Sequence, residues 1–282
     1  MALPELVDQN VSTIAAILAA MGVVAILESA IPLHTAGSTR KAHLKPNLAL
    51  TFITFATNIF FNLALLLAMT ALRSNHFGLL HLLPVGSFWA AVIAVIGLDF
   101  SSYVAHVAMH KIPAFWRFHQ VHHSDPEVDV TTTIRQHPGE GVIRFAFMAA
   151  FAVALGPSPA AFAVYRLWSA LSGLMEHANI RVPRQVDVVL SLITTWPNMH
   201  KVHHSRNPLE TDTNYGNIFS WFDRLFRTFT PSERGTSIVY GLDGLDDTAT
   251  QTTAGLLALP FRESKPANQG VDRVPTRIGA RQ

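Results

Sequence analysis

The chain has 282 residues, of which 49% are hydrophobic and only 14% are charged, and its formal net charge is +2. This composition argues against an ordinary soluble protein and favours a membrane protein, and the scattered basic residues argue against a nucleic-acid partner. Cysteine is absent, so disulfides, thiolate nucleophiles and iron–sulfur clusters are excluded. Any bound metal must be held by nitrogen and oxygen ligands.

Three apolar stretches at the start of the chain are long enough to span a bilayer, at residues 11–33, 48–72 and 87–105. The first follows an acidic segment rather than the basic one of a cleavable signal peptide, so a retained helix is expected. The sequence therefore predicts an integral membrane protein with at least three spanning helices.

A helical hairpin is predicted within residues 141–176. Its apolar arms, 141–155 and 160–174, are joined by Gly156-Pro157-Ser158-Pro159, and each arm alone is short for a span. The hairpin is either shallowly re-entrant or fully crossing. From Arg262 onward the composition is polar and aperiodic, which predicts a disordered tail over 262–282.

The orientation follows from the positive-inside rule. Arg40, Lys41 and Lys45 lie in the first loop, whereas only Arg73 borders the second, so the first loop is expected in the cytoplasm. The predicted fold is an all-α membrane protein with about four transmembrane or hairpin helices, capped by a cytoplasmic helical dome. Three regions are expected: transmembrane helices in 1–110, a catalytic region in 111–261 and the tail in 262–282.

Three histidine clusters carry the chemistry: the pair His106 and His110, and two HxxHH motifs, His119-Gln-Val-His122-His123 and His200-Lys-Val-His203-His204. Residues four apart lie on one face of a helix, and neighbouring residues point about 100° apart, so one turn can serve two metal ions. The clusters supply eight imidazoles, too many for one ion, which predicts a two-metal centre on the cytoplasmic side. The ligands expected from them are His106, His110, His119, His122, His123, His200, His203 and His204.

Further site residues are expected around these clusters. His177 and His137 are additional candidate metal ligands, and Asp99, seven residues before His106, is expected to orient a ligand imidazole. Asn179, Asn214 and Tyr215 are the remaining polar candidates for a catalytic role, although the segment around Tyr215 also has the composition of a turn. Histidines outside the clusters are interpreted as structural. These are His34, His43, His76 and His81.

In combination these motifs resemble the fatty acid hydroxylase and sterol desaturase superfamily of membrane di-iron oxygenases. The resemblance covers residues 98–261 and departs from many relatives at Val107 and Arg227. Its elements are Asp99 with His106 and His110; the segments 115–124, 135–140 and 177–179; and the segments 199–205, 213–216 and 221–226. The resemblance implies two iron ions, dioxygen as co-substrate, and electrons from an external donor protein.

Two functions from different classes are open at this stage. The first is a membrane oxidoreductase that hydroxylates or desaturates a C–H bond of a lipid, such as a sterol or a fatty acyl chain, that arrives from the bilayer. The alternative is a histidine-rich protein that binds or transports a metal such as zinc. A transporter is expected to place ionisable residues near the middle of several spans, whereas here they gather beside the spans.

Overall fold

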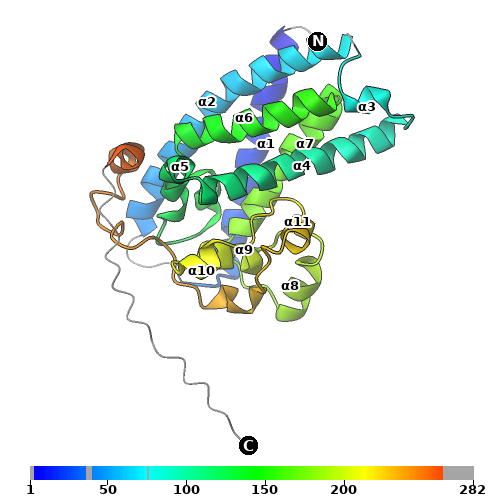
Figure 1. Cartoon of the computed structure of the whole chain (residues 1–282). Coiled ribbons are helices and arrows are strands. Elements are labelled where there is room, and N and C mark those ends of the chain that lie inside the picture. The colour runs from blue at the N-terminus through cyan, green and yellow to red at the C-terminus, as the bar shows by residue number, and fades with distance from the viewer. Residues whose placement is uncertain (1–2, 36–39, 75, 263–282) are drawn as a thin grey trace, which may run out of the picture.

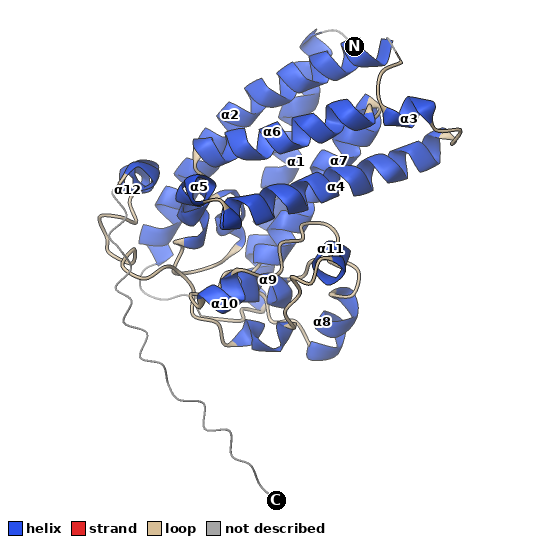
Figure 2. Cartoon of the chain, in the orientation of Figure 1, coloured by secondary structure: helices blue, strands red, loops and turns tan. Residues whose placement is uncertain are grey.

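The computed structural model describes residues 3–35, 40–74 and 76–262. Helices account for all the regular structure in these residues, and the only β pairings there are two isolated bridges, Pro32 with Ile180 and Thr194 with Phe219 (Figure 2). The elements are α1 (Leu3–Ala30), α2 (Arg40–Ser74), α3 (Leu79–Leu82), α4 (Ser87–Lys111), α5 (Pro113–His123), η1 (Val130–Ile134), α6 (Pro138–Leu155), α7 (Pro159–His177), α8 (Arg184–Leu190), α9 (Pro197–His203), α10 (Pro208–Thr211), α11 (Trp221–Leu225), η2 (Ser232–Thr236), α12 (Thr253–Ala258) and η3 (Leu259–Phe261).

Five long helices, α1, α2, α4, α6 and α7, run side by side and form the membrane bundle (Figure 1). Four of them contain stretches long and apolar enough to cross a membrane: Val11–Ala30, His43–Leu72, Ser87–Lys111 and Pro138–Leu155. The prediction of an all-α membrane protein with about four such helices is confirmed.

The predicted hairpin is formed by α6 and α7. Gly156 ends α6 in the left-handed conformation, with φ 66°, and a Cβ there would lie 2.4 Å from the carbonyl oxygen of Phe77, so the turn requires glycine. Ser158 then caps α7 by accepting a hydrogen bond from the amide of Ala161. Both arms are longer than predicted, because α6 begins at Pro138 and α7 continues to His177.

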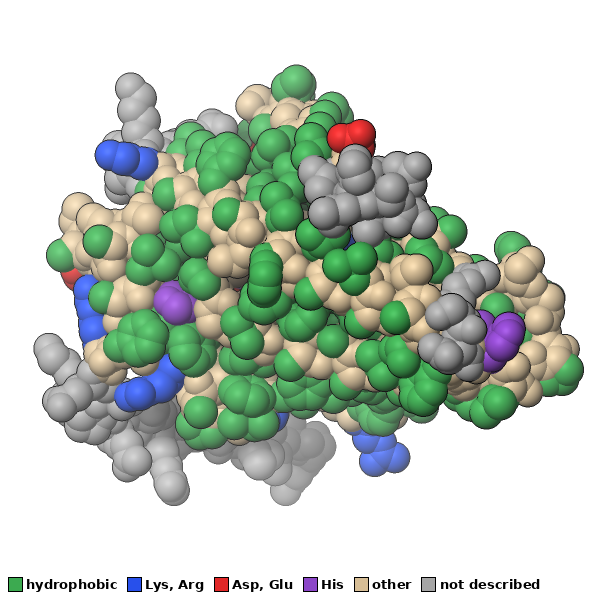
Figure 3. Space-filling view, turned by 90° about the horizontal axis from the view of Figure 1, so that it is seen from above, with side chains coloured by type: hydrophobic (Ala, Val, Ile, Leu, Met, Phe, Trp, Pro, Cys, Tyr) green, Lys and Arg blue, Asp and Glu red, His purple; other side chains and the backbone are tan. Residues whose placement is uncertain are grey.

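The outer faces of the bundle are apolar. The relative solvent-accessible surface is 58% for Val23 and 70% for Ile26, both in α1, and 70% for Phe60 in α2. One face of the molecule is covered mainly by hydrophobic side chains, with charged groups sparse among them (Figure 3). Such a surface is stable in lipid and unfavourable in water, which agrees with insertion of the bundle in a bilayer.

Of the short elements, α3 lies at the far end of the bundle, beside the start of α4 (Figure 1). The others, α5, η1 and everything from α8 to η3, form a cap that we call the histidine dome. It covers the end of the bundle where α4 and α7 finish and where α6 begins (Figure 1). The division predicted at residue 110 falls beside the end of α4 at Lys111, and the tail predicted at 262–282 lies outside the described residues except for Arg262.

Candidate metal centre

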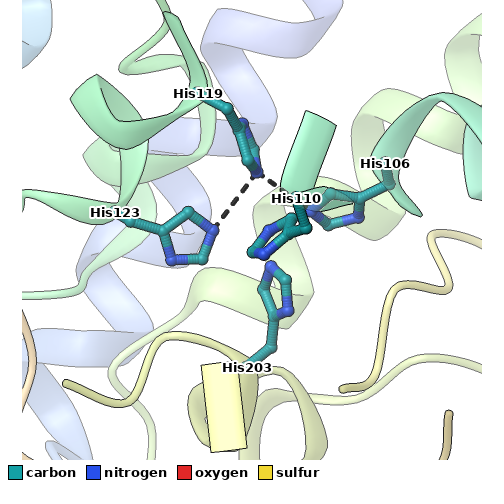
Figure 4. Close-up of side chains that lie close together, drawn as sticks. All are labelled: His106, His110, His119, His123 and His203. Atoms are coloured by element: carbon teal, nitrogen blue, oxygen red, sulfur yellow. Dashed lines mark hydrogen bonds between the residues drawn. The ribbon is translucent and has the colours of Figure 1, made fainter. Parts of the chain in front are cut away.

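Nine of the ten histidines proposed as ligands come together where the dome meets the bundle. Their ring nitrogens fall into two groups, within each of which one nitrogen per residue lies within 4.8 Å of all the others. Group A is His106, His110, His119, His123 and His203, and group B is His122, His177, His200 and His204. Figure 4 shows the rings of group A directed toward one another.

Each of the two short helices with an HxxHH motif serves both groups. Helix α5 gives the i, i+4 pair His119 and His123 to group A and sends His122 to group B. The motif at α9, whose last histidine directly follows the helix, does the reverse: it gives His200 and His204 to group B and His203 to group A. The divergence of neighbouring side chains on a helix thus divides the two motifs between two adjacent sites. The groups abut, since the rings of His123 and His204 stack with centroids 4.6 Å apart.

The distances between nitrogens fit ligands of one ion better than mutual hydrogen bonds. The Nε2 atom of His177 lies 3.1 Å from Nε2 of both His122 and His200, and 3.2 Å from that of His204. One ring nitrogen carries a single proton or a single lone pair and cannot bond to three partners. Ligand nitrogens about 2.1 Å from a common ion are separated by about 2.9–3.4 Å, so a cation would satisfy all four nitrogens of group B.

Group A shows the same convergence. The Nε2 atom of His119 lies 3.1 Å from that of His106 and 3.2 Å from that of His123. The Nε2 atoms of His110 and His203 are buried and have no hydrogen-bond partner in the described part of the chain. A buried nitrogen without a partner is costly unless something occupies the space it faces. The donor set therefore fits a bound metal ion in each group.

Backbone carbonyls fix the tautomer of three of these rings. Nδ1 of His177 donates to the carbonyl of Gly173 at 2.8 Å, Nδ1 of His106 to that of Tyr215 at 2.9 Å and Nδ1 of His203 to that of Thr213 at 2.7 Å. A neutral imidazole that donates from Nδ1 has its lone pair on Nε2, so each ring presents a metal-binding nitrogen to its group.

Carboxylates orient other rings of the two groups. Asp212 accepts from Nδ1 of His110 at 3.2 Å and from Lys111 at 2.6 Å. Glu140, which is completely buried, lies 3.1 Å from Nδ1 of His119 and 2.8 Å from Arg144. Such partners hold a ligand ring in position and increase its basicity.

Burial sets the protonation of the dome histidines. It lowers the pKa of His119, His122 and His123 well below 6.5, and neighbouring imidazoles lower it further. The same holds for His200, His203 and His204. Neutral rings with free lone pairs are the form that binds metal, so the environment prepares the site for a cation. The hydrogen bond from His110 lowers the pKa of Asp212 to about 2, so this carboxylate stays ionised.

A buried arginine fixes α5, which carries three of the histidines. Arg135 is fully buried and donates to the carbonyl of Val121 at 3.0 Å, to Asn47 at 2.7 Å and to Ser124 at 3.0 Å. It also supports Asp125: burial alone would raise the pKa of this carboxyl, but Arg135 and His43 hold it well below its usual range. His43 donates from Nδ1 to Asp125 at 2.8 Å and lies outside both groups, as a structural histidine should.

Asp99 has a different role from the one predicted. It accepts hydrogen bonds from the amides of Ile218 and Phe219 at 3.1 and 3.0 Å and from Asn217, and no imidazole of the described residues is among its hydrogen-bond partners. The carboxylate ties α4 to the loop after Tyr215 and satisfies amides that have no helical partner.

Tyr215 and Asn214 shape the loop that holds His106. Buried Asp223 accepts from the amides of Tyr215 and Gly216 at 2.7 and 2.8 Å, and burial raises its pKa to about 6. Gly216 is needed because a Cβ there would lie 2.7 Å from the carbonyl oxygen of Phe219. The ring of Tyr215 packs against His106, His110 and His203. Asn214, at φ 57°, anchors the loop by donating to Met199 and Thr230.

Two other expected site residues lie away from the groups. Asn179 exchanges hydrogen bonds with the backbone of His34 at 3.0 and 2.8 Å, so its side chain joins the ends of α1 and α7. His137 caps α6 by accepting from Gly139 at 2.9 Å, and its Nε2 lies 3.2 Å from the carbonyl of Leu257. Because both nitrogens of His137 have backbone partners, the structure does not bring it to the metal centre.

Sequence reasoning missed several groups that orient the ligands. Glu140 is the last residue of the recognised segment 135–140 and Glu176 directly precedes the segment 177–179, but nothing in the spacing paired Glu140 with His119. Glu176 lies 3.9 Å from Nδ1 of His177 and 4.0 Å from that of His200. The carbonyls of Gly173, Thr213 and Tyr215 carry no signal in the sequence, because any residue supplies one.

A cavity of about 260 Å³ extends from the histidines into the membrane bundle. His106, His122, His177 and His200 form its dome end. Its walls combine apolar side chains from α1, α2, α6 and α7 with several polar ones. The apolar set includes Ile14, Ile17, Phe55, Leu66, Phe145 and Phe162. An elongated apolar molecule can therefore approach both histidine groups from the bundle side.

Fold and site together define an all-helical membrane protein with a histidine-rich two-group centre at the end of a lipid-facing bundle. Residues 91–228, which contain all nine grouped histidines, match the fatty acid hydroxylase family. The match confirms, over this region, the predicted resemblance to the fatty acid hydroxylase and sterol desaturase superfamily.

Curated relatives share about a third of their aligned residues with this chain. Alkylglycerol monooxygenase from Caenorhabditis elegans is 31% identical over 60% of this chain and 32% of its own length. The Homo sapiens protein of that name is 30% identical over 57% of this chain and 34% of its own length. Ornithine lipid hydroxylase OlsE from Rhizobium tropici is 31% identical over 54% and 45%. The alignments thus span less than half of these relatives, and no solved structure gives a significant match.

Proposed function

We propose that the protein is a membrane-bound oxygenase that hydroxylates a C–H bond of a lipid, with two iron ions as cofactor, dioxygen as co-substrate and electrons from a separate donor protein. The observation that carries this proposal is the convergence of two buried histidine groups at the end of a cavity in the bundle. An aqueous substrate has no need of a route through a lipid-facing bundle, whereas a lipid does.

The two groups would hold one iron ion each, group A through five imidazoles and group B through four. When bound, the irons supply the place where dioxygen is activated for attack on the C–H bond. The chain's own residues prepare this place. Gly173, Thr213 and Tyr215 keep Nδ1 protonated and Nε2 free on three ligands, and Glu140 and Asp212 orient two more.

The relatives support hydroxylation over desaturation. Their names describe a monooxygenase of alkylglycerols and a hydroxylase of ornithine lipids. For this chain we propose the shared chemistry, insertion of oxygen into a lipid C–H bond. The catalytic region then comprises residues 111–261 together with His106 and His110.

We place the histidine dome on the cytoplasmic side of a cell or inner membrane. Lys45 lies near the start of α2, two residues after His43, and His43 contacts Asp125 beside the metal centre. The dome therefore lies at the same end of the bundle as the basic residues of the predicted cytoplasmic loop. A soluble or membrane-bound reductase would then deliver its electrons from this side.

The proposal predicts lipid-dependent consumption of dioxygen. The purified protein, loaded with iron and supplied with a reductant and lipid extract, should transfer oxygen from isotopically heavy dioxygen into a lipid, as detected by mass spectrometry. His122→Ala serves as the inactive control. Incorporation of oxygen from labelled water instead of dioxygen would contradict the proposal. So would the absence of labelled oxygen from every lipid class tested with the iron-loaded protein.

Metal transport has no comparable geometric support. A transporter binds its ion near the middle of the membrane, between two halves that open alternately. Here the nine grouped histidines all lie at one end of the bundle, and zinc bound to them during expression would occupy the proposed iron positions.

A further inference from the structure

One face of α7 lines the cavity for most of the length of the helix. Arg166, Ser169, Gly173 and His177 are spaced three or four residues apart on this face and all border the cavity. The opposite face carries Val164, Leu167, Trp168 and Leu171, which are exposed, as expected for side chains in contact with lipid. Arg166 therefore points inward, into the bundle, and not toward the bilayer.

Arg166 lacks a counter-ion in the described part of the chain. Its one hydrogen-bond contact joins Nη1 to the sulfur of Met148 at 3.7 Å, and no described carboxylate lies within 4.0 Å. Arg144, which borders the same cavity, differs because Glu140 neutralises it at 2.8 Å. A guanidinium stays charged in proteins, and an unpaired charge within a membrane bundle is unfavourable.

Other polar groups without partners border the same cavity. Asn58 and Asn62 lie one turn apart on α2, and neither side chain has a hydrogen bond in the described residues. The cavity thus combines the guanidinium of Arg166 and the side-chain amides of Asn58 and Asn62 within apolar walls, and the sulfur of Met148 is their one acceptor among the described residues. This combination suits an oxyanion rather than an apolar chain end.

We propose that the cavity takes an amphiphile with an oxyanionic group, a carboxylate or a phosphate, which pairs with Arg166 while its chain extends along Ser169 and Gly173 to the histidines. This inference rests on the proposed function and specifies its substrate class. Residues 166 and 177 are eleven positions apart, a distance of about 16 Å along the axis at about 1.5 Å per residue. The oxidised carbon is therefore remote from the anionic group.

Direct binding tests this assignment without turnover. The full-length protein is placed in nanodiscs of phosphatidylcholine, and the affinities of radiolabelled hexadecanoic acid, hexadecyl phosphate and hexadecanol are compared. We expect one or both anions to bind at least about tenfold more tightly than the alcohol, because a charge-assisted hydrogen bond is lost with the alcohol. The anion that binds more tightly shows whether the site takes a carboxylate or a phosphate.

Variants separate the guanidinium from general effects. Arg166→Gln should reduce anion affinity at least about tenfold and leave the alcohol unchanged, Arg166→Lys should retain the preference, and Arg181→Gln, at an exposed position outside the cavity, should behave as wild type. Equal affinities of the wild type for anion and alcohol, or unchanged anion affinity in Arg166→Gln, would overturn the inference. If Arg166→Gln fails to fold, the inference is tested by whether the wild type and Arg166→Lys both bind the anions more tightly than hexadecanol.

Failure here and failure of the proposed function are distinguishable. Binding requires neither dioxygen nor a reductant, so a protein that prefers anions but never oxidises them contradicts only the proposed function. A protein that hydroxylates a neutral lipid and ignores charge contradicts only the assignment of Arg166.

Discussion

The membrane bundle and the histidine dome differ in which side chains they expose and which they bury. On the outside of the bundle, side chains such as Val23 and Ile26 are exposed and apolar, whereas in the dome Arg135, Lys201 and Asp125 are completely buried. Lipid accepts any apolar side chain, so the bundle surface needs hydrophobicity but few specific partners. The dome needs a partner for each buried polar group, so its residues are far less replaceable.

Lys201 illustrates the demands of the dome. It is completely buried next to His200 and donates to the carbonyl of Ala178 at 2.8 Å, and burial lowers its pKa to about 7. A lysine on the bundle surface would extend to the headgroups instead. The comparison implies that substitutions in the dome have large effects and that outward substitutions in the bundle have small ones.

The largest effect is expected when one histidine of a group is removed. His122→Ala takes one of four ligands from group B and should lower turnover more than about 100-fold, beyond the loss typical of outer contacts. Oxygen uptake with a lipid substrate measures it, and His81→Ala, at an exposed position outside the groups, is the matched control. Comparable activity in both variants would contradict the assignment of group B.

Loss of the buried guanidinium of Arg135 is expected to destabilise the dome. Arg135→Gln leaves Asp125 and several acceptors without their charged partner and should lower the free energy of unfolding by about 3–5 kcal/mol. Thermal unfolding of the protein in detergent provides the measurement. Arg184→Gln, whose side chain is 76% exposed, should stay within about 1 kcal/mol. Equal destabilisation of the two variants would contradict the proposal that the buried contacts of Arg135 contribute more to stability than an exposed ion pair.

An intermediate effect is expected at Glu140. Glu140→Gln keeps the size of the side chain but removes the charge between His119 and Arg144, and should weaken metal binding by about 10–100-fold. Competition with a chelator reports the affinity, and Glu233→Gln at an exposed site is the control. Unchanged affinity would show that His119 needs no carboxylate.

The smallest effect is expected at Arg227, which has φ 60° in the dome. A non-glycine residue in this conformation costs about 1–2 kcal/mol, and the greater flexibility of glycine in the unfolded chain offsets about half of any gain. Arg227→Gly should therefore raise the free energy of unfolding by up to about 1 kcal/mol, whereas Arg227→Ala should not. A loss of stability on introducing glycine would show that the arginine side chain contributes more than its backbone strain costs.

The sequence predicted the bundle well because long apolar stretches have few alternatives to membrane helices. The histidine spacing likewise predicted which rings share a helix face, and the structure brings nine of them together. Spacing alone could not divide them into two groups, because His122 and His203 each join histidines that are distant in the sequence. Asp99 and His137 were misjudged for a similar reason: their partners, the amides after Asn217 and the carbonyl of Leu257, are set only by tertiary packing.

Metal content tests the central claim most directly. Plasma mass spectrometry of iron-loaded protein, with concentration from amino-acid analysis, should give two irons per chain. His106→Ala combined with His110→Ala leaves three imidazoles in group A, and His177→Ala leaves three in group B, so each of these two variants should retain about one iron. The variant that combines all three substitutions should retain none. A wild type that binds one ion or none, or a variant of one group that still binds two, would contradict the two-metal centre.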